Sequence, residues 1–211
     1  MKIAGIDEAG KGPVIGPLVV CGVACDENLL KKLPELGVRD SKKLTPKKRK
    51  EIAGKLRKIL DWEAVVIQAA ELDRMMEEKT INEILKEACV KIISKLNPDV
   101  AFIDSFDVKP ERLEKEIEEM TGCRVVAKHR GESEPVVAAA SIIAKCLRDE
   151  MVERLRERYG DFGSGYASDE RTRRWLEDRL RKGEVPEIVR RSWKTVDRMR
   201  GTLKQKNLSE F

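Results

Sequence analysis

The sequence predicts an α/β fold in which a mixed five-stranded sheet is flanked by helices and followed by a C-terminal helical extension. The first observation is a pair of apolar runs, residues 3–6 and 15–24, separated by a glycine turn as in a β-hairpin. The second is that short apolar strands then alternate with helical patterns, the order that places helices on both faces of a sheet. With 41% hydrophobic residues, the 211-residue chain can bury a full core as one domain with a modest appendage.

The remaining elements follow from periodicity and from their end signals. Short apolar runs predict three further strands, at residues 64–68, 100–103 and 124–127. Apolar residues at three- and four-residue spacing predict four helices, at residues 45–60, 80–96, 110–120 and 135–159. Pro46 suits a first helical turn, where its missing N–H has no helical partner, and Asn97-Pro98 ends the second helix. After the glycine-rich residues 160–166 the pattern is helical and basic.

The first apolar run ends in two adjacent carboxylates, Asp7 and Glu8, followed at once by Gly10-Lys11-Gly12. Successive side chains of a strand point to opposite faces, so these carboxylates can serve one site only at the strand's end. Glycine permits both a sharp exit from the strand and the close approach of a ligand. Taken alone, such a segment is more often an ordinary solvated turn.

Asp104 supplies a partner, because residues 100–104 repeat the design of an apolar strand that ends in a carboxylate. In open α/β sheets ligands gather beyond the carboxyl ends of strands. Three clustered carboxylates repel one another unless divalent cations neutralise them, and oxygen ligands suit Mg²⁺ or Mn²⁺. Asp104 alone could be a strand-end cap, but the three acids together favour a metal site acting on a phosphodiester.

The distribution of charge indicates a nucleic-acid partner. The net charge is only +5, but Lys and Arg are concentrated in residues 42–58 and 171–200, whereas acids gather in 71–87 and 111–119. A single charged run is usually a solvated face. Two basic segments on either side of a carboxylate site make a phosphate backbone the better hypothesis.

The histidine and cysteine content excludes other chemistries. His129 is the single histidine of the sequence, which argues against a multi-histidine zinc site and against histidine-based nucleophilic catalysis. Five cysteines without a C-x-x-C pair indicate buried, reduced thiols. The sequence shows no signal peptide and no apolar run long enough to span a bilayer, so we expect a cytoplasmic protein with no membrane partner.

Six segments resemble the conserved blocks of ribonuclease HII, in the archaeal type with a short C-terminal helical tail. They are GIDEAGKGPVIGPLVV, GVRDSKKL, TINEI, VAFIDSFD, VVAAASIIAK and GDFGSGY, in that family's order. The resemblance extends to about residue 195. It implies a ribonuclease H-like catalytic domain at residues 1–160, a substrate-binding helical extension at 161–200 and a flexible tail at 201–211. It also implies hydrolysis of the RNA strand of RNA/DNA hybrids, and of single ribonucleotides within duplex DNA, to give 3′-hydroxyl and 5′-phosphate ends.

The resemblance assigns roles residue by residue. Asp7, Glu8 and Asp104 would hold two Mg²⁺ or Mn²⁺ ions, and the backbone of Gly10-Lys11-Gly12 would contact the ribonucleotide's 2′-hydroxyl. Tyr166 would stack at the sugar that follows the ribonucleotide. Seven further residues lie in motifs that hold the site or nearby phosphates in the family: Asp40, Ser41, Lys42, Thr80, Asn82, Ser141 and Lys145.

One segment departs from the family pattern. The family usually has a fourth carboxylate, an Asp in a basic-Ala-Asp stretch just before the long helix. Here residues 129–135 are HRGESEP. Counting forward from His129 selects Glu132 as the fourth catalytic carboxylate and metal ligand, whereas counting back from Pro135 leaves Glu134 open.

The C-terminal residues 205–211 resemble a sliding-clamp docking peptide, with Gln205 for a polar pocket and Leu208 and Phe211 for an apolar one. A frayed tail is the alternative. We expect a monomer. Two other functions remain open at this point: a ribonuclease H-fold DNA nuclease such as a junction resolvase, and a non-catalytic hybrid-binding protein. The related ribonuclease HIII would carry an extra N-terminal domain.

Overall fold

The computed structural model describes residues 1–38 and 44–209, with side chains to residue 202. These residues form two compact units that interleave along the chain. Unit 1 comprises Met1–Ala9, Val19–Val66 without residues 39–43, and Thr80–Arg148. Unit 2 comprises Gly10–Leu18, Ile67–Lys79 and the described residues from Asp149 onward. The division into a catalytic domain at residues 1–160 and a substrate-binding extension after it remains a prediction.

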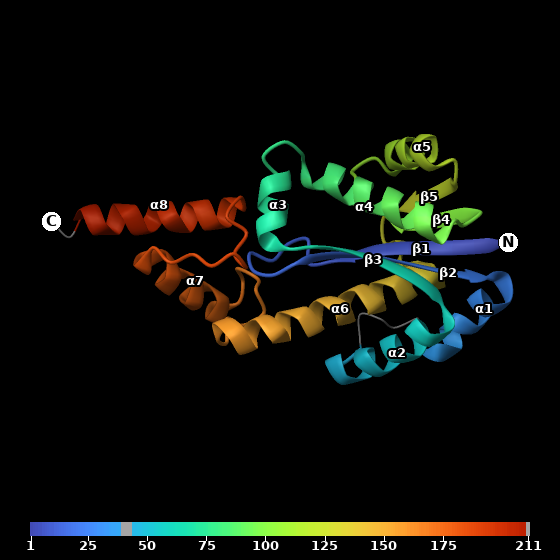
Figure 1. Cartoon of the computed structure of the whole chain (residues 1–211), viewed down its shortest axis with the longest axis horizontal. Helices are drawn as coiled ribbons and strands as arrows, with labels where there is room; N and C mark the ends of the chain where they lie inside the picture. The colour runs from blue at the N-terminus through green and yellow to red at the C-terminus, as the bar shows by residue number, and fades with distance from the viewer. Residues whose placement is uncertain (39–43, 210–211) are drawn as a thin grey trace. The chain divides into compact units, whose positions relative to one another are not determined.

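Unit 1 contains the sheet, and its mixed five-stranded architecture confirms the predicted fold class. The strands are β1 (Lys2–Ala9), β2 (Leu18–Asp26), β3 (Asp61–Ile67), β4 (Val100–Asp104) and β5 (Arg124–Lys128), in the spatial order β3-β2-β1-β4-β5 (Figure 1). β1 and β2 pair antiparallel, whereas β4 is parallel to both β1 and β5. The hairpin therefore supplies the central strand, and the later strands add beside it.

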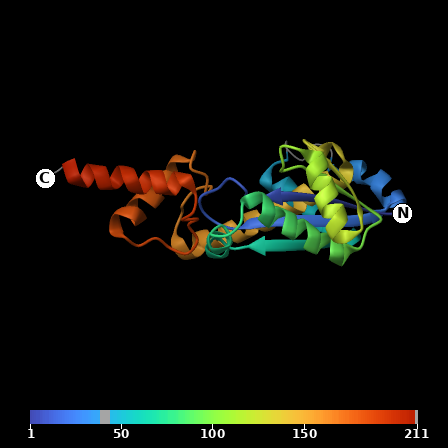
Figure 2. The same cartoon turned by 90° about the horizontal axis from the view of Figure 1, so that it is seen from above.

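Helices lie on both faces of the sheet. Figure 1 shows α4 (Ile81–Leu96) and α5 (Pro110–Thr121) on one face, with α2 (Pro46–Ile59) and α6 (Pro135–Tyr159) on the other. One of them, α6, continues from unit 1 into unit 2 at Asp149. Seen from above in Figure 2, α4 and α5 lie over the strands together. These are the four helices that the apolar periodicity predicts.

Two strand glycines let the helices approach closely. A Cβ atom at Gly5 of β1 would lie 2.4 Å from the backbone carbon of Val136 in α6. A Cβ atom at Gly22 of β2 would lie 2.3 Å from a methyl carbon of Ile92 in α4. Real side chains do not approach that closely, so each glycine permits direct contact between strand and helix.

Two short helices were not predicted. α1 (Glu27–Lys32) buries none of its residues, so it has no apolar stripe; it begins where Asp26 accepts a hydrogen bond from the backbone N–H of Leu29. α3 (Ala69–Met75), in unit 2, buries only Ala69 and Leu72.

Unit 2 has its own core, built around α7 (Glu170–Lys182), the start of α8 (Lys194–Ser209) and the segment that connects β1 to β2. Its buried apolar residues are Val14, Ile15, Val152, Phe162, Leu176, Ile188, Val189 and Val196. The sequence assigns Ile15 to the second strand, but β2 begins only at Leu18. Gly16 has a φ of 90°, outside the range of a strand, and Ile15 instead forms an isolated bridge with Val189.

All five cysteines are buried and none forms a disulfide, as predicted. Among the described residues, no helix has the length and apolar content that crossing a membrane requires.

Candidate active site

Asp7 and Glu8 lie inside β1, whereas the sequence predicts them at the strand's end. β1 is longer than its apolar run because its residues through Ala9 still pair with β2. The two side chains therefore point to opposite faces of the sheet. Pairing with the parallel strand β4 stops at Ile6, so both carboxylates stand at the carboxyl edge of the β1–β4 ladder. Asp7 is 7% exposed, and Glu8 is half-buried.

Helix α6 brings two polar side chains to Asp7. Gly5 and Asp7 share a face of β1 and lie two residues apart, about 6.7 Å along a strand. Val137 packs against Gly5, and Ser141 lies four residues further along α6, about 6 Å along a helix. Because strand and helix advance together, fully buried Ser141 reaches Asp7 and hydrogen-bonds to it.

Lys145 extends this arrangement by one more helical turn. Its ammonium group donates a hydrogen bond to Ser141 Oγ at 2.7 Å, and its charge also acts on Asp7. The structure therefore brings Ser141 and Lys145, both predicted site residues, to Asp7.

Asp104 ends β4 on the same face as Asp7. The paired residues Ile6 and Ile103 precede the two acids in neighbouring parallel strands, so their side chains share an orientation. The Gly131 N–H donates to Asp104 Oδ1 at 2.8 Å. A Cβ atom at residue 131 would lie 2.9 Å from Asp104 Cα, so a glycine is required for this contact.

The turn that binds Asp104 also carries both candidates for the fourth carboxylate. Glu132 follows Gly131 in the 3₁₀ helix η3 (Gly131–Ser133) and is half-buried. Glu134 accepts a hydrogen bond from Lys128 Nζ at 2.9 Å. Lys128 is the β5 partner of Asp104 in the sheet register. Glu134 thus forms an ion pair beside the site, and the choice between Glu132 and Glu134 as the fourth carboxylate remains a prediction.

The pKa of Asp7 is raised to about 6, chiefly because the carboxylate is buried. The charge of Asp104 contributes to the rise, whereas Ser141, the Glu8 N–H and Lys145 act to lower the pKa. A buried carboxylate beside a second one is a hard oxygen donor set that suits a divalent cation. Within the part of the chain that the structure describes, no three His, Cys, Asp or Glu side chains are already grouped as metal ligands. The four-carboxylate ligand set thus remains a prediction.

The raised pKa of Asp7 predicts a pH-dependent stability of the metal-free protein. Well below pH 3.8, its ordinary pKa, Asp7 is protonated in both the folded and the unfolded state. As the pH rises towards 6, the unfolded state releases this proton more readily, so the folded state loses stability. The free energy of unfolding of Asp7→Asn minus that of the wild type should therefore grow by roughly 2 kcal/mol between pH 4 and 7. Urea unfolding in EDTA measures this difference, and a constant value across that range would contradict it.

The predicted ribose contact and Tyr166 come together in unit 2. We call residues 10–16 the glycine loop. The N–H groups of Val14 and Ile15 both donate to Gly165 O, at 2.8 and 3.2 Å. A Cβ atom at Gly12 would lie 3.6 Å from the Tyr166 ring, and Tyr166 is 41% exposed. At Gly12 the loop thus presents main chain that no side chain covers, next to an accessible aromatic ring.

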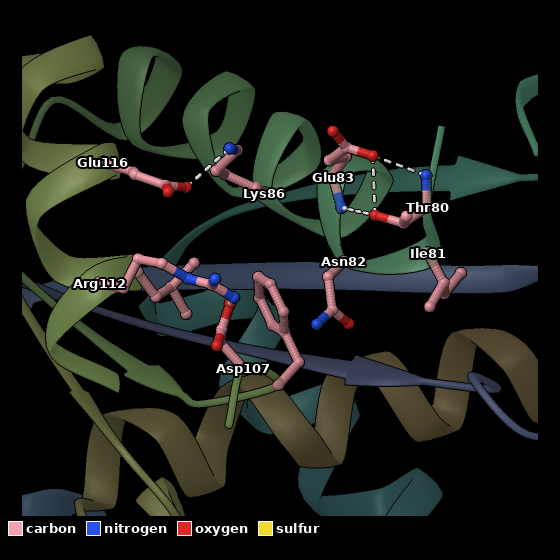
Figure 3. Close-up of a pocket in the computed structure, with 10 residues that line it drawn as sticks. Thr80, Ile81, Asn82, Glu83, Lys86, Asp107, Arg112 and Glu116 are labelled. Carbon is pink, nitrogen blue, oxygen red and sulfur yellow. Dashed lines mark hydrogen bonds and ion pairs between the residues drawn. The ribbon is translucent and has the colours of Figure 1, made fainter. Parts of the chain in front are cut away.

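Thr80 and Asn82 line a pocket of about 480 Å³ at the start of α4, shown in Figure 3. Thr80 caps α4: its hydroxyl accepts from the Glu83 N–H and donates to the Glu83 carboxylate. The cations of the pocket, Lys86 and Arg112, are paired with the acids Glu116 and Asp107. Nothing in this charge balance favours a phosphate, and the role of Thr80 and Asn82 in substrate binding remains a prediction.

Six predicted site residues lie wholly or partly outside the described part of the chain. Asp40, Ser41, Lys42 and Phe211 lie outside the described residues, and of Gln205 and Leu208 only the backbone of α8 is described. Conversely, the sequence analysis missed the structural parts played by Gly5 and Gly131 at the site. A glycine within a strand is a signal of close backbone approach and could have identified Gly5.

Carboxylates at the carboxyl edge of a mixed sheet, with Ser141 and Lys145 of the long helix α6 beside Asp7, define a nuclease of the ribonuclease H-like fold class. The comparisons narrow this class. The family model described as Ribonuclease HII matches residues 4–196. A ribonuclease HII of Archaeoglobus fulgidus is 55% identical over 210 residues, which cover 99% of each chain.

Solved structures agree. The structure of the PCNA:RNase HII complex from Archaeoglobus fulgidus has a TM-score of 0.89 at 55% identity, covering 92% of this chain and 96% of that one. The ribonuclease H2 of Pyrococcus horikoshii OT3 has a TM-score of 0.90 at 40% identity, covering 97% and 99%. The chain belongs to the ribonuclease HII family. It is therefore a metal-dependent endoribonuclease, which excludes a non-catalytic binding protein.

Proposed function

We propose that this protein cuts the RNA strand of RNA/DNA hybrids and cuts duplex DNA at single embedded ribonucleotides, leaving 3′-hydroxyl and 5′-phosphate ends. The observation that supports this most directly is that the carboxylates and the glycine loop follow each other along the chain. A single residue, Ala9, separates Glu8 of the carboxylate edge from Gly10 of the glycine loop. Cleavage chemistry and sugar recognition are thus built on adjacent residues.

The metal ligands in this proposal are Asp7, Glu8, Asp104 and Glu132, holding two Mg²⁺ or Mn²⁺ ions. When bound, such ions activate water and neutralise the charge that develops on the leaving oxygen. The chain's own groups prepare the site. The hydrogen bond from Ser141 and the charge of Lys145 favour the ionised form of Asp7, and the Gly131 N–H orients the Asp104 carboxylate. Glu8 faces the other side of β1 and would join the site from the strand's edge.

The glycine loop would select the sugar. The 2′-hydroxyl is the group that distinguishes RNA from DNA, and glycine permits main-chain groups to approach it. Tyr166, held beside Gly12 by the hydrogen bonds to Gly165, would stack at the following sugar. The basic segments at residues 42–58 and 171–200 would add sequence-independent attraction to the phosphates.

The deciding experiment uses an end-labelled DNA duplex with one embedded ribonucleotide. It is incubated with Mg²⁺ or Mn²⁺ beside an all-DNA duplex of the same sequence and an RNA/DNA hybrid. We expect cuts in the hybrid and at the ribonucleotide, and none in all-DNA. Cutting of all-DNA at comparable rates would favour the DNA nuclease alternative, such as a junction resolvase.

The choice of Glu132 as fourth carboxylate has a matched control in Glu134. We expect Glu132→Ala to lower hydrolysis by about 100-fold, roughly 3 kcal/mol in activation free energy, while leaving hybrid binding within about twofold. Glu134→Ala removes a carboxylate from the same turn but should lower hydrolysis less than about fivefold. Initial rates and binding in EDTA measure both. The reverse ranking of the two variants would show that Glu134 is the ligand.

A sliding clamp is the proposed protein partner. The relative from Archaeoglobus fulgidus is described in complex with PCNA. In this chain Gln205, Leu208 and Phe211 would form the docking peptide at the end of α8. Clamp binding that survives deletion of residues 205–211 would overturn this assignment. A monomeric state and a cytoplasmic location remain predictions.

A further inference from the structure

Arg190 lies in the basic segment of the C-terminal region, yet its side chain is completely buried. Burying an arginine is unfavourable unless its charge is compensated by hydrogen bonds. The guanidinium group donates from Nε to Gly16 O at 2.9 Å and from Nη1 to Lys11 O at 3.2 Å. Both acceptors are main-chain carbonyls of the glycine loop, all within unit 2.

The two carbonyls belong to residues near the two ends of the glycine loop. Gly10 and Gly16 have φ values of 87° and 90°, a region that glycine enters easily but does not prefer over others. A loop bounded by such residues needs external contacts to hold one conformation. The guanidinium is a planar fork with donors in fixed directions, so one side chain can fix the separation of two acceptors.

The neighbours of Arg190 hold the same loop through backbone contacts. Its own N–H donates to Val14 O at 2.9 Å, and Gly16 N–H donates to Ile188 O at 2.9 Å. The bridge between Ile15 and Val189 lies between these bonds. The Trp193 ring covers the guanidinium, with its centroid 4.9 Å from the Arg190 Cζ atom. Arg190 therefore cannot turn away from the loop without uncovering a buried charge.

We propose that Arg190 is a positioning residue that sets the conformation of the glycine loop and thereby the enzyme's discrimination between ribose and deoxyribose. This inference rests on the proposed contact of the loop with the 2′-hydroxyl. Arg190 acts on the substrate through Lys11 and Gly16 rather than by contact. It thus differs from the exposed cations of the same segment, whose role would be to attract phosphates of any sugar.

The test uses Arg190→Lys, which keeps the charge but replaces the fork with a single ammonium group. The matched control is Arg191→Lys, the same change at the next residue, where the guanidinium donates to Val185 O instead of the loop. Fluorescence anisotropy in EDTA gives the Kd for a duplex with one ribonucleotide and for the all-DNA duplex. The wild type should bind the ribonucleotide duplex more tightly, so its Kd for all-DNA divided by its Kd for the ribonucleotide duplex should exceed one. Arg190→Lys should lower this Kd ratio by about tenfold, or about 1.4 kcal/mol.

The controls and the results that would overturn the role of Arg190 are as follows. In Arg190→Lys the affinity for all-DNA should stay within about twofold of the wild type, and Arg191→Lys should keep the wild-type ratio. An unchanged ratio in a folded Arg190→Lys would overturn the inference while leaving the proposed function intact. A wild type that shows no preference would instead overturn the ribose contact itself, and the inference with it. If Arg190→Lys and Arg190→Gln both lose their far-ultraviolet circular dichroism at the assay temperature, the residue is structural and the proposal is wrong.

Discussion

Asp7→Asn is expected to lower ribonucleotide-dependent hydrolysis by about 1000-fold, equivalent to roughly 4 kcal/mol in activation free energy, with duplex binding retained. The amide keeps the shape of the side chain and can still contact Ser141, but it removes the negative charge that a divalent ion requires. Single-turnover cleavage of the ribonucleotide duplex, with binding measured separately in EDTA, checks this result.

The control for Asp7→Asn is Asp61→Asn, the same change in strand β3 of unit 1. The Asp61 side chain is 68% exposed and pairs with Lys2 at the surface, where an ion pair contributes little. Its cleavage rate should stay within about twofold of the wild type. An Asp7→Asn enzyme as active as this control would remove Asp7 from the catalytic site.

Gly5→Ala should have the largest effect on stability. The added methyl group would lie 2.4 and 2.5 Å from backbone atoms of Val136 and Val137, and backbone atoms cannot rotate away as a flexible side chain can. We expect a loss of about 3 kcal/mol in the free energy of unfolding. We also expect reduced hydrolysis in the folded fraction, because α6 must move away from β1 and take Ser141 with it. Urea unfolding and cleavage rates per folded molecule measure the two effects.

Gly54→Ala is the matched control for Gly5→Ala. Gly54 lies within helix α2, and a Cβ atom there would meet nothing within 4 Å. Alanine is the better helix former, so this variant should be more stable than the wild type by about 1 kcal/mol. Equal effects of the two substitutions would contradict the contact between β1 and α6.

The helices and strands that could be predicted from the sequence are those whose buried residues recur at regular spacing. α4 buries seven residues at helical spacing, and its boundaries follow from Thr80 and Asn97. α1 buries none, so no apolar pattern could indicate it. The sheet was predicted as mixed and five-stranded, but the ends of β1 and β2 were not, because pairing between strands extends through polar residues such as Asp7 and Glu8.

At the site, the sequence indicated which carboxylates come together but not which contacts fix their positions. Asp7 and Asp104 could be predicted to meet because each follows a short apolar strand segment, and the structure places Asp104 close enough to raise the pKa of Asp7. The contact of Gly131 with Asp104 and that of Arg190 with Gly16 join residues 27 and 174 positions apart. No periodicity or spacing encodes such a pairing. Arg190 looked like one more surface cation because composition does not report burial.

The distance along the chain between the glycine loop and its support has a consequence for the order in which the protein matures. Strands β1 and β2 can pair once residues 2–26 have left the ribosome, since their contacts are local. The loop between them acquires its fixed shape only when residues 188–190 have been made, after the carboxylates and the whole of α6. Sugar selectivity would therefore arise late in synthesis, after the catalytic carboxylates have been made, and would be lost if a protease removes the chain from Ile188 onward.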